Sequence, residues 1–192
     1  MVEDNDPINV ILASARTEIL HHGILGLRVA DVAANANTSI TQIYRFFRNR
    51  DGLLARVLGD IFEEITQASV HQFKKRLLGK ESLTIDDLVN ALPLDITPEV
   101  EKLQEFRLQI LATSIHNVQL RQNLETSMQN LKVFWTEGLH EIQQRMAPGE
   151  AFDTRFFFMV LGQQLPYYRV LAKDALFTTE EFRDFVREKI RR

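Results

Sequence analysis

The chain has 192 residues, enough for one or two small domains, and its 45% hydrophobic and 26% charged residues are typical of a globular protein with a buried core. Cysteine is absent, which excludes a disulfide framework and a thiolate zinc site. The acidic first residues lack the apolar segment of a signal peptide, and no apolar run approaches the roughly 20 residues that span a bilayer. We therefore expect a cytoplasmic protein without a membrane partner.

The net charge of −3 argues weakly against nucleic-acid binding, but the charges are unevenly placed. Between residues 28 and 56, five arginines stand against Asp31 and Asp51, which gives this stretch a local charge of +3. The rest of the chain carries the negative balance. This distribution is expected if only one end of the molecule meets phosphate.

Helix start and stop residues divide the sequence into about nine predicted helices, whereas strand patterns are scarce. Asp6 and Pro7 begin the first helix, and Gly23 ends it. Leu27–Phe47 has the pattern of a helix-turn-helix, and Asn49 then caps a long fourth helix that ends near Gly79. The later predicted helices follow in order: Thr84 to Pro93, one from Thr97, one over Leu124–Ile142, one over Phe152–Lys173 and one from Thr178. We therefore expect an all-α fold.

Small and apolar residues of Leu27–Phe47 are spaced to bury its two short helices in a shared core: Val32, Ala33, Ala36, Thr38, Ile43 and Phe46. Asn37 occupies the turn, where the backbone must enter the left-handed region. Ser39 can cap the second helix, and Gln42 makes a capping box plausible. The outer face of that helix is polar with one cation, as a helix in a major groove needs.

The residues that carry a family resemblance are Gly23–Leu27, Val32–Ala33, Ile43–Tyr44, Phe47 and Asn49–Leu53. Together they resemble the DNA-binding domain of the TetR family over roughly residues 11–58, about a quarter of the chain. The sequence departs from the family pattern at three positions: Asn37 replaces the usual Gly, Arg28 a usual Thr or Ser, and Glu18 an apolar residue. The last departure predicts that one face of the first helix is more exposed than usual.

The resemblance implies a three-helix head, residues 1–49, joined by the long fourth helix to an α-helical ligand-binding and dimerisation domain, residues 50–192. It also implies a sequence-specific transcriptional regulator that acts as a homodimer on a palindromic operator. Such a dimer places its recognition helices in successive major grooves, about 34–36 Å apart. The implied mechanism is that of a repressor that a small molecule releases from DNA. The small molecule favours a conformation in which the separation of the two recognition helices no longer matches the major grooves.

The candidate DNA contacts lie on and around the second helix of the helix-turn-helix: Arg28, Ser39, Ile40, Thr41, Gln42, Tyr44, Arg45, Arg48 and Arg50. The alternative for the arginines is an ordinary solvated basic face. Tyr44 could instead belong to the core, although the family pattern directs its hydroxyl to phosphate. Gln42 could read a base or use its amide in the capping box.

The predicted eighth helix is apolar on all sides, which suggests burial both in the core and against a partner. The candidate dimer contacts are Phe156, Phe157, Leu161, Phe182, Phe185 and Val186. The alternative is a central core helix without a partner.

Large side chains on the sixth, seventh and eighth helices are candidates for a small-molecule cavity: Phe106, Ile110, His116, Met128, Leu131, Trp135, Phe158, Gln163, Gln164 and Tyr168. Because few of them ionise, we expect a hydrophobic or aromatic, near-neutral effector. The alternative is a closed core at normal packing density.

No cofactor or metal ion is expected. His21 and His22 are adjacent on a helix and point about 100° apart, and the other histidines lack ligand spacing. No phosphate loop, dinucleotide fingerprint, zinc-protease motif or nucleophile elbow occurs, so we expect no enzyme. The main alternative function is a helical small-molecule-binding or adaptor protein that has lost DNA binding.

Overall fold

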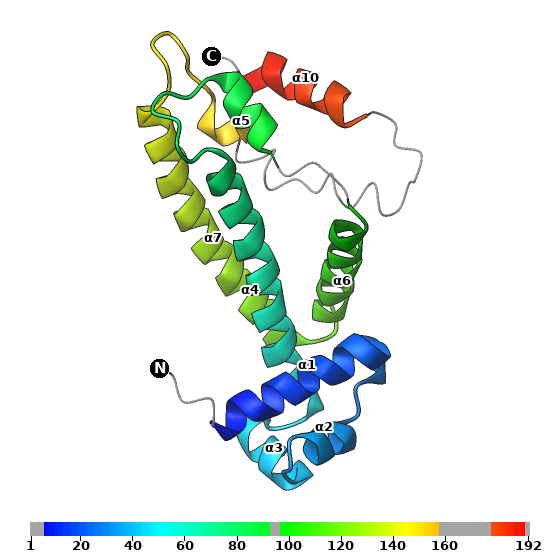
Figure 1. Cartoon of the computed structure of the whole chain (residues 1–192). Coiled ribbons are helices and arrows are strands. Elements are labelled where there is room, and N and C mark those ends of the chain that lie inside the picture. The colour runs from blue at the N-terminus through cyan, green and yellow to red at the C-terminus, as the bar shows by residue number, and fades with distance from the viewer. Residues whose placement is uncertain (1–5, 93–96, 158–177, 191–192) are drawn as a thin grey trace. The chain divides into compact units, whose positions relative to one another are not determined.

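The computed structural model describes residues 6–92, 97–157 and 178–190, and these residues are mainly helical (Figure 1). The helices are α1 (Pro7–Gly26), α2 (Val29–Asn35), α3 (Ile40–Phe47), α4 (Arg50–Arg76), α5 (Ile85–Ala91), α6 (Pro98–Ser114), α7 (Val118–Gln144) and α10 (Thr179–Ile190). Within these ranges there is no strand, although a short parallel bridge joins Leu83 to Met146. The predicted all-α fold is confirmed. None of the helices in the described ranges combines the length and apolar character of a membrane span.

Backbone contacts divide the chain into two compact units. The head unit comprises residues 1–64 and 109–127, and the rear unit comprises residues 65–108 and 128–192. The helices α4, α6 and α7 each contribute to both units. The head unit therefore holds the predicted helix-turn-helix together with the start of α4, the end of α6 and the start of α7.

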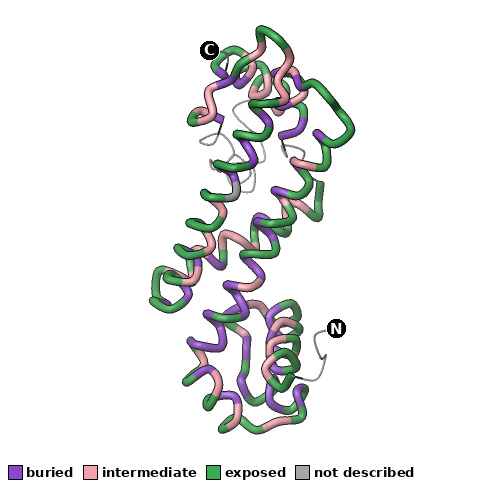
Figure 2. The backbone as a smooth tube through the Cα atoms, turned by 90° about the vertical axis from the view of Figure 1, so that its left-hand side faces the viewer, coloured by how far each residue is buried: buried purple, intermediate pink, exposed green. Residues whose placement is uncertain are grey.

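Local capping sets the first helix. The carboxylate of Asp6 accepts a hydrogen bond from the backbone N–H of Ile8 at 2.9 Å, and Pro7 occupies the first turn. Gly23 breaks the helical dihedrals with φ 73° and ψ 171°, as its predicted role as a stop requires, and one more turn follows to Gly26. Buried residues recur on α1, α2 and α3 among exposed ones (Figure 2) and form the core of the head unit.

Within the head unit, the start of α7 is bonded to the start of α4. The side chain of Asn117 accepts a hydrogen bond from the backbone N–H of Leu120 at 3.0 Å and donates to the carbonyl oxygen of Asp51 at 2.9 Å. Asn123 donates to the carbonyl oxygen of Ala55 at 3.1 Å. The sequence predicted a break near His116–Val118 but not this use of Asn117, which is buried.

The rear unit has an aromatic core. The ring centroid of Phe73 lies 5.3 Å from that of Trp135 and 5.7 Å from that of Phe157, and Phe157 lies 5.6 Å from Phe152. Phe157 is 0% exposed, and so is Val186, which belongs to the same core. Both were predicted to lie in a dimer interface, and that prediction is wrong for these two residues because they are already buried within their own chain.

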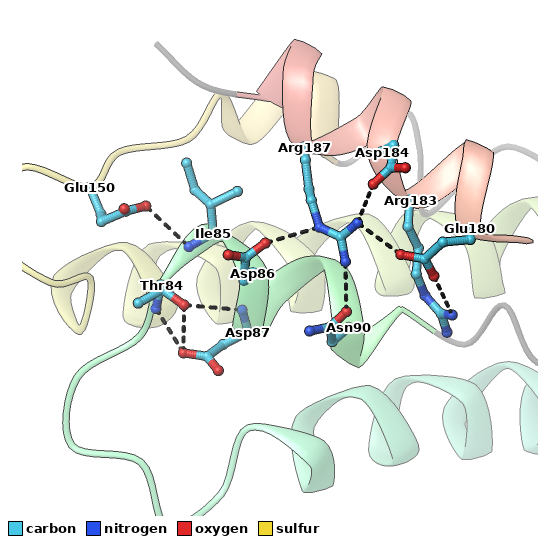
Figure 3. A network of polar contacts seen from close by, with 10 residues as sticks. All are labelled: Thr84, Ile85, Asp86, Asp87, Asn90, Glu150, Glu180, Arg183, Asp184 and Arg187. Carbon is cyan, nitrogen blue, oxygen red and sulfur yellow. Dashed lines mark hydrogen bonds and ion pairs between the residues drawn. The ribbon is translucent and has the colours of Figure 1, made fainter.

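Polar side chains hold α10 against α5 (Figure 3). The guanidinium of Arg187 donates to Asp86 at 2.9 Å and to Asn90 at 3.1 Å, both on α5, and to Glu180 at 3.0 Å on α10 itself. The N-terminus of α5 carries a capping box in which Thr84 and Asp87 bond each other's backbone N–H groups. Charge-assisted contacts therefore fix the register of two helices that lie far apart in sequence.

Asp87 gives this end of the rear unit a defined pH response. A hydrogen bond from Lys80 and then one from the backbone N–H of Thr84 lower the pKa of Asp87 from 3.8 to about 2. Replacing Lys80 by methionine should lower the free energy of unfolding by about 1 kcal/mol at pH 7, since the pair is partly exposed. A depressed pKa contributes stability that is complete above the unfolded value near 4 and is lost as the pH falls through 2. Urea unfolding at pH 7 and pH 2.5 should therefore show a smaller difference between the variants at the lower pH, and an equal difference at both would contradict this account.

Candidate nucleic-acid interface

The turn between α2 and α3 has the predicted backbone. Asn37 adopts φ 49°, in the left-handed region that Asn tolerates better than most residues. The backbone N–H groups of Asn37 and Thr38 donate to the carbonyl oxygens of Ala34 at 3.2 Å and Ala33 at 2.9 Å, which closes the turn. Ala33 is buried, so the two helices approach closely at a small side chain.

The helix α3 has distinct inner and outer faces. Its N-terminus is capped by Ser39, whose hydroxyl accepts from the backbone N–H of Gln42 at 3.1 Å. Ile43 and Phe47 are buried, whereas Phe46, which was predicted to lie in the core, is only half-buried. The outer face consists of exposed side chains with the half-buried Gln42 among them: Ile40, Thr41, Tyr44 and Arg45. Tyr44 is 38% exposed and therefore not a core residue.

Arg48, directly after α3, has an unusual backbone conformation. Its φ of 68° and ψ of −50° accompany a hydrogen bond from the N–H of Asn49 to the carbonyl oxygen of Phe47 at 2.8 Å, the geometry of a strained γ-turn. A residue with a Cβ atom is unfavourable here, and such strain is often kept at functional sites. The side chain of Arg48 is exposed beside the outer face of α3.

Most cations of the head unit are already bonded within the protein. Arg16 pairs with Glu64, Arg56 donates to Asp60 at 2.8 Å, and Arg121 donates to the backbone carbonyl oxygens of residues 114 and 115. Among the head-unit arginines that the structure describes, those left without an ion pair or a side-chain hydrogen bond are Arg28, Arg45 and Arg48. All three flank or belong to α2 and α3. The uncompensated positive charge of the head unit is therefore gathered around the helix-turn-helix.

Arg50 has a different role from the one expected. Its guanidinium donates to the carbonyl oxygens of Leu27 at 3.2 Å, Ile24 at 3.3 Å and Leu25 at 3.3 Å. These carbonyls lie at the end of α1 and in the connection to α2, so the side chain joins the start of α4 to that connection. We therefore revise the prediction and treat Arg50 as a positioning residue rather than a phosphate contact.

Glu18 also differs from expectation. The sequence predicted an exposed face of α1 at this residue, but Glu18 is only 6% exposed. Its Oε1 accepts from the side-chain amide of Asn35 at 2.9 Å, and its Oε2 lies 3.8 Å from the Nε2 atom of His22. The carboxylate thus links α1 to the last residue of α2.

The predicted ligand-binding residues fall in different parts of the chain. Ile110, which is buried, and His116, which is exposed, belong to the head unit. Trp135 packs in the aromatic core of the rear unit, Leu131 packs against that core, Phe106 is half-buried and Met128 is exposed. Phe158, Gln163, Gln164 and Tyr168 lie outside the described residues, as does the predicted interface residue Leu161. The described residues contain no cluster of three or more His, Cys, Asp or Glu side chains suited to a metal ion.

Comparison with known proteins agrees with this geometry. The family described as "Bacterial regulatory proteins, tetR family" matches residues 11–57. Residues 11–57 therefore match the helix-turn-helix domain of the TetR family. No match was found among curated proteins.

The similarity to TetR-family structures extends beyond that domain. A TetR-family transcriptional regulator from Rhodococcus sp. is 23% identical, with 95% of each chain covered and a TM-score of 0.57. One from Mesorhizobium loti is 13% identical, with 98% of this chain and 95% of that chain covered and a TM-score of 0.64. At such low identities the likeness shows a shared helical fold over nearly the whole chain and nothing finer.

Proposed function

We propose that this protein is a sequence-specific DNA-binding transcriptional regulator. The observation that carries the proposal is the outer face of α3, where polar and aromatic side chains are exposed and the unpaired Arg28, Arg45 and Arg48 surround them. A short helix with such a face suits the major groove, and flanking cations suit phosphate. We assign residues 1–49 to DNA binding and residues 50–192 to ligand binding and dimerisation, and we propose that the protein acts in the cytoplasm.

The side chains of this face have separable roles. Arg45 lies in the last turn of α3 on its exposed side, and we assign it to a base edge, since arginine pairs bidentately with guanine. Arg28 at the start of α2 and Arg48 after α3 are assigned to phosphates on either side. Tyr44 is assigned to a phosphate, and Ile40, Thr41 and Gln42 are assigned to base edges in the major groove.

We further propose a homodimer on a palindromic operator and release of DNA by a small hydrophobic or aromatic effector. Phe185 supports the dimer, because it is 49% exposed and stacks on the half-buried Phe182 with ring centroids 6.5 Å apart. With Phe156 and Leu161, these residues form the proposed interface, related by a two-fold axis. The effector would bind within residues 50–192, the region assigned above to ligand binding.

Two substitutions test the DNA-binding proposal. Arg45→Ala should weaken binding to the selected sequence by roughly 1–3 kcal/mol and relax the preference at one position of each half-site. Arg48→Gly should weaken binding to all sequences about equally, yet leave the free energy of unfolding unchanged or higher, because glycine tolerates the positive φ. The measurements are random-sequence DNA selection, electrophoretic mobility shifts and chemical denaturation.

Arg56→Ala is the matched control. It removes the same charge from the head unit, but its guanidinium is paired with Asp60, so DNA affinity should change little. If the wild-type protein selects no salt-sensitive DNA sequence at all, the proposal is wrong. The second candidate function is then a helical small-molecule-binding protein, which the small number of unpaired cations in the head unit would favour.

A further inference from the structure

A pocket of about 480 Å³ lies in the rear unit, on α7 and the helical turn that begins at Thr154. This volume is within the range of small-molecule sites. The α7 residues that line it are Lys132, Thr136, Leu139, His140 and Gln143, which recur at steps of three and four positions and so lie along one face of the helix. The pocket is lined by the basic side chains of Lys132, His140 and Arg155 and by Thr136, Gln143 and Leu139.

The lining of the pocket is positively charged. None of the described residues that line it is acidic, whereas Lys132 and Arg155 are cations. In the described part of the chain, neither Lys132 nor Arg155 forms an ion pair. By contrast, Lys80, Arg183 and Arg187 of the same unit all do. Two unpaired cations on one pocket attract an anion.

The neighbouring carboxylate of Asp153 bonds to the backbone of the turn rather than to the guanidinium of Arg155. One of its oxygens accepts hydrogen bonds from the backbone N–H groups of Arg155 at 2.8 Å and Phe156 at 3.0 Å. It therefore caps the helical turn that begins at Thr154, and the guanidinium of Arg155 remains available for a ligand.

Leu139 is the apolar side chain among the described residues that line the pocket. It is buried and belongs to the hydrophobic core of the rear unit together with Trp135 and Ile142. Apolar surface in the same pocket as donor groups suits a ligand with one charged end and one hydrophobic end. An inorganic ion would leave the apolar part of the pocket unfilled.

We propose that this pocket binds an organic carboxylate with an apolar body. The carboxylate pairs with the guanidinium of Arg155, which can hold it through two parallel hydrogen bonds, and with the ammonium of Lys132. The side-chain amide of Gln143 supplies a further donor. His140 also lines the pocket, but its Nε2 atom already lies 3.1 Å from the amide nitrogen of Gln144. The apolar body lies over Leu139. None of the described residues that line this pocket is among the candidate effector residues named from the sequence, and carboxylate binding here does not depend on DNA binding.

Titration calorimetry on the full-length protein without DNA tests the inference with two probes, decanoate and 2-naphthoate, which represent aliphatic and aromatic acids. We expect at least one of them to bind in a one-to-one ratio, and 1-decanol and inorganic phosphate to bind at least about tenfold more weakly. The double variant Lys132→Gln, Arg155→Gln should weaken binding of the carboxylate by at least about tenfold as well. Because both side chains are exposed, the fold should be retained, which the melting temperature checks.

Two further variants separate the pocket from general charge effects. Lys75→Gln removes an exposed cation of the same unit that does not line the pocket, and binding should be unchanged. Arg155→Lys keeps the charge and should bind more tightly than Arg155→Gln. The proposal is overturned if neither acid binds, if phosphate binds as well as the acids, if 1-decanol does, or if Lys75→Gln weakens binding as much as the double variant. If the wild-type protein binds the carboxylate but no specific DNA, the proposed function is wrong and the carboxylate site stands.

Discussion

Replacing Gly52 by alanine is expected to unfold or rearrange the helix-turn-helix and to abolish specific DNA binding. A Cβ atom on Gly52 would lie 1.9 Å from the carbonyl oxygen of Phe47 and 3.1 Å from its carbonyl carbon. Phe47 is the last residue of α3, and its carbonyl oxygen also accepts the hydrogen bond of the γ-turn at Arg48. Backbone atoms must therefore move, at a cost of about 3 kcal/mol or more. Chemical denaturation and mobility shifts on the selected DNA measure the two effects.

Gly59→Ala is the matched control for this prediction. Gly59 lies two turns further along α4, where a Cβ atom would meet the side chain of Asn123 at 3.5 Å, an ordinary contact. Alanine has the higher helix propensity, so this variant should be as stable as the wild type or more stable by up to about 1 kcal/mol. Equal stability of the two alanine variants would mean that α3 and α4 do not meet as closely as described.

Replacing Phe157 by alanine is expected to lower the free energy of unfolding by about 3–5 kcal/mol. The ring of Phe157 is completely buried against Phe73 and Phe152, so its removal leaves a cavity in the rear-unit core. A residue that served only a dimer interface would instead change the association constant and leave the stability of the monomer intact. Denaturation monitored at two protein concentrations distinguishes these cases.

Phe185→Glu provides the contrast. Phe185 is half-exposed on α10, so a charge there costs little in the monomer but would be buried in the proposed interface. Sedimentation at micromolar concentration should give a dimer for the wild type and a monomer for this variant. A monomeric wild type, or a Phe157→Ala variant of unchanged stability, would contradict the present assignment of the two residues.

Features that depend on neighbours within four residues were predicted correctly from the sequence. The helix starts at Asp6, Ser39 and Thr178 and the left-handed Asn37 are of this kind, because each forms its hydrogen bonds or its turn locally. The same holds for the stop at Gly23. Capping and turn chemistry do not require knowledge of the tertiary fold.

Features that depend on distant residues were predicted poorly. Adjacent residues of a helix differ by about 100° in direction, so the spacing alone could not decide between Phe46 and Phe47 for the core. The partners of Arg50 lie at least 23 residues away, and the partner of Glu18 lies 17 residues away. Phe157 belongs to an apolar run, and the sequence of such a run does not distinguish residues buried within their own chain from residues buried against a partner. A glycine inside a helix, such as Gly52, gave no sign that a carbonyl oxygen lies against it.

The scarcity of unpaired cations in the head unit bears on how the proposed DNA binding would respond to ionic strength. If Arg28 and Arg48 of each protomer neutralise one phosphate each, a dimer releases about four counterions from the DNA. The logarithm of the binding constant then falls with the logarithm of the salt concentration at a slope of about −3.6. Regulators that make many more phosphate contacts lose affinity much more steeply. Occupancy of the operator would then follow the concentration of the effector more than the salt content of the cell, which changes whenever a bacterium meets osmotic stress.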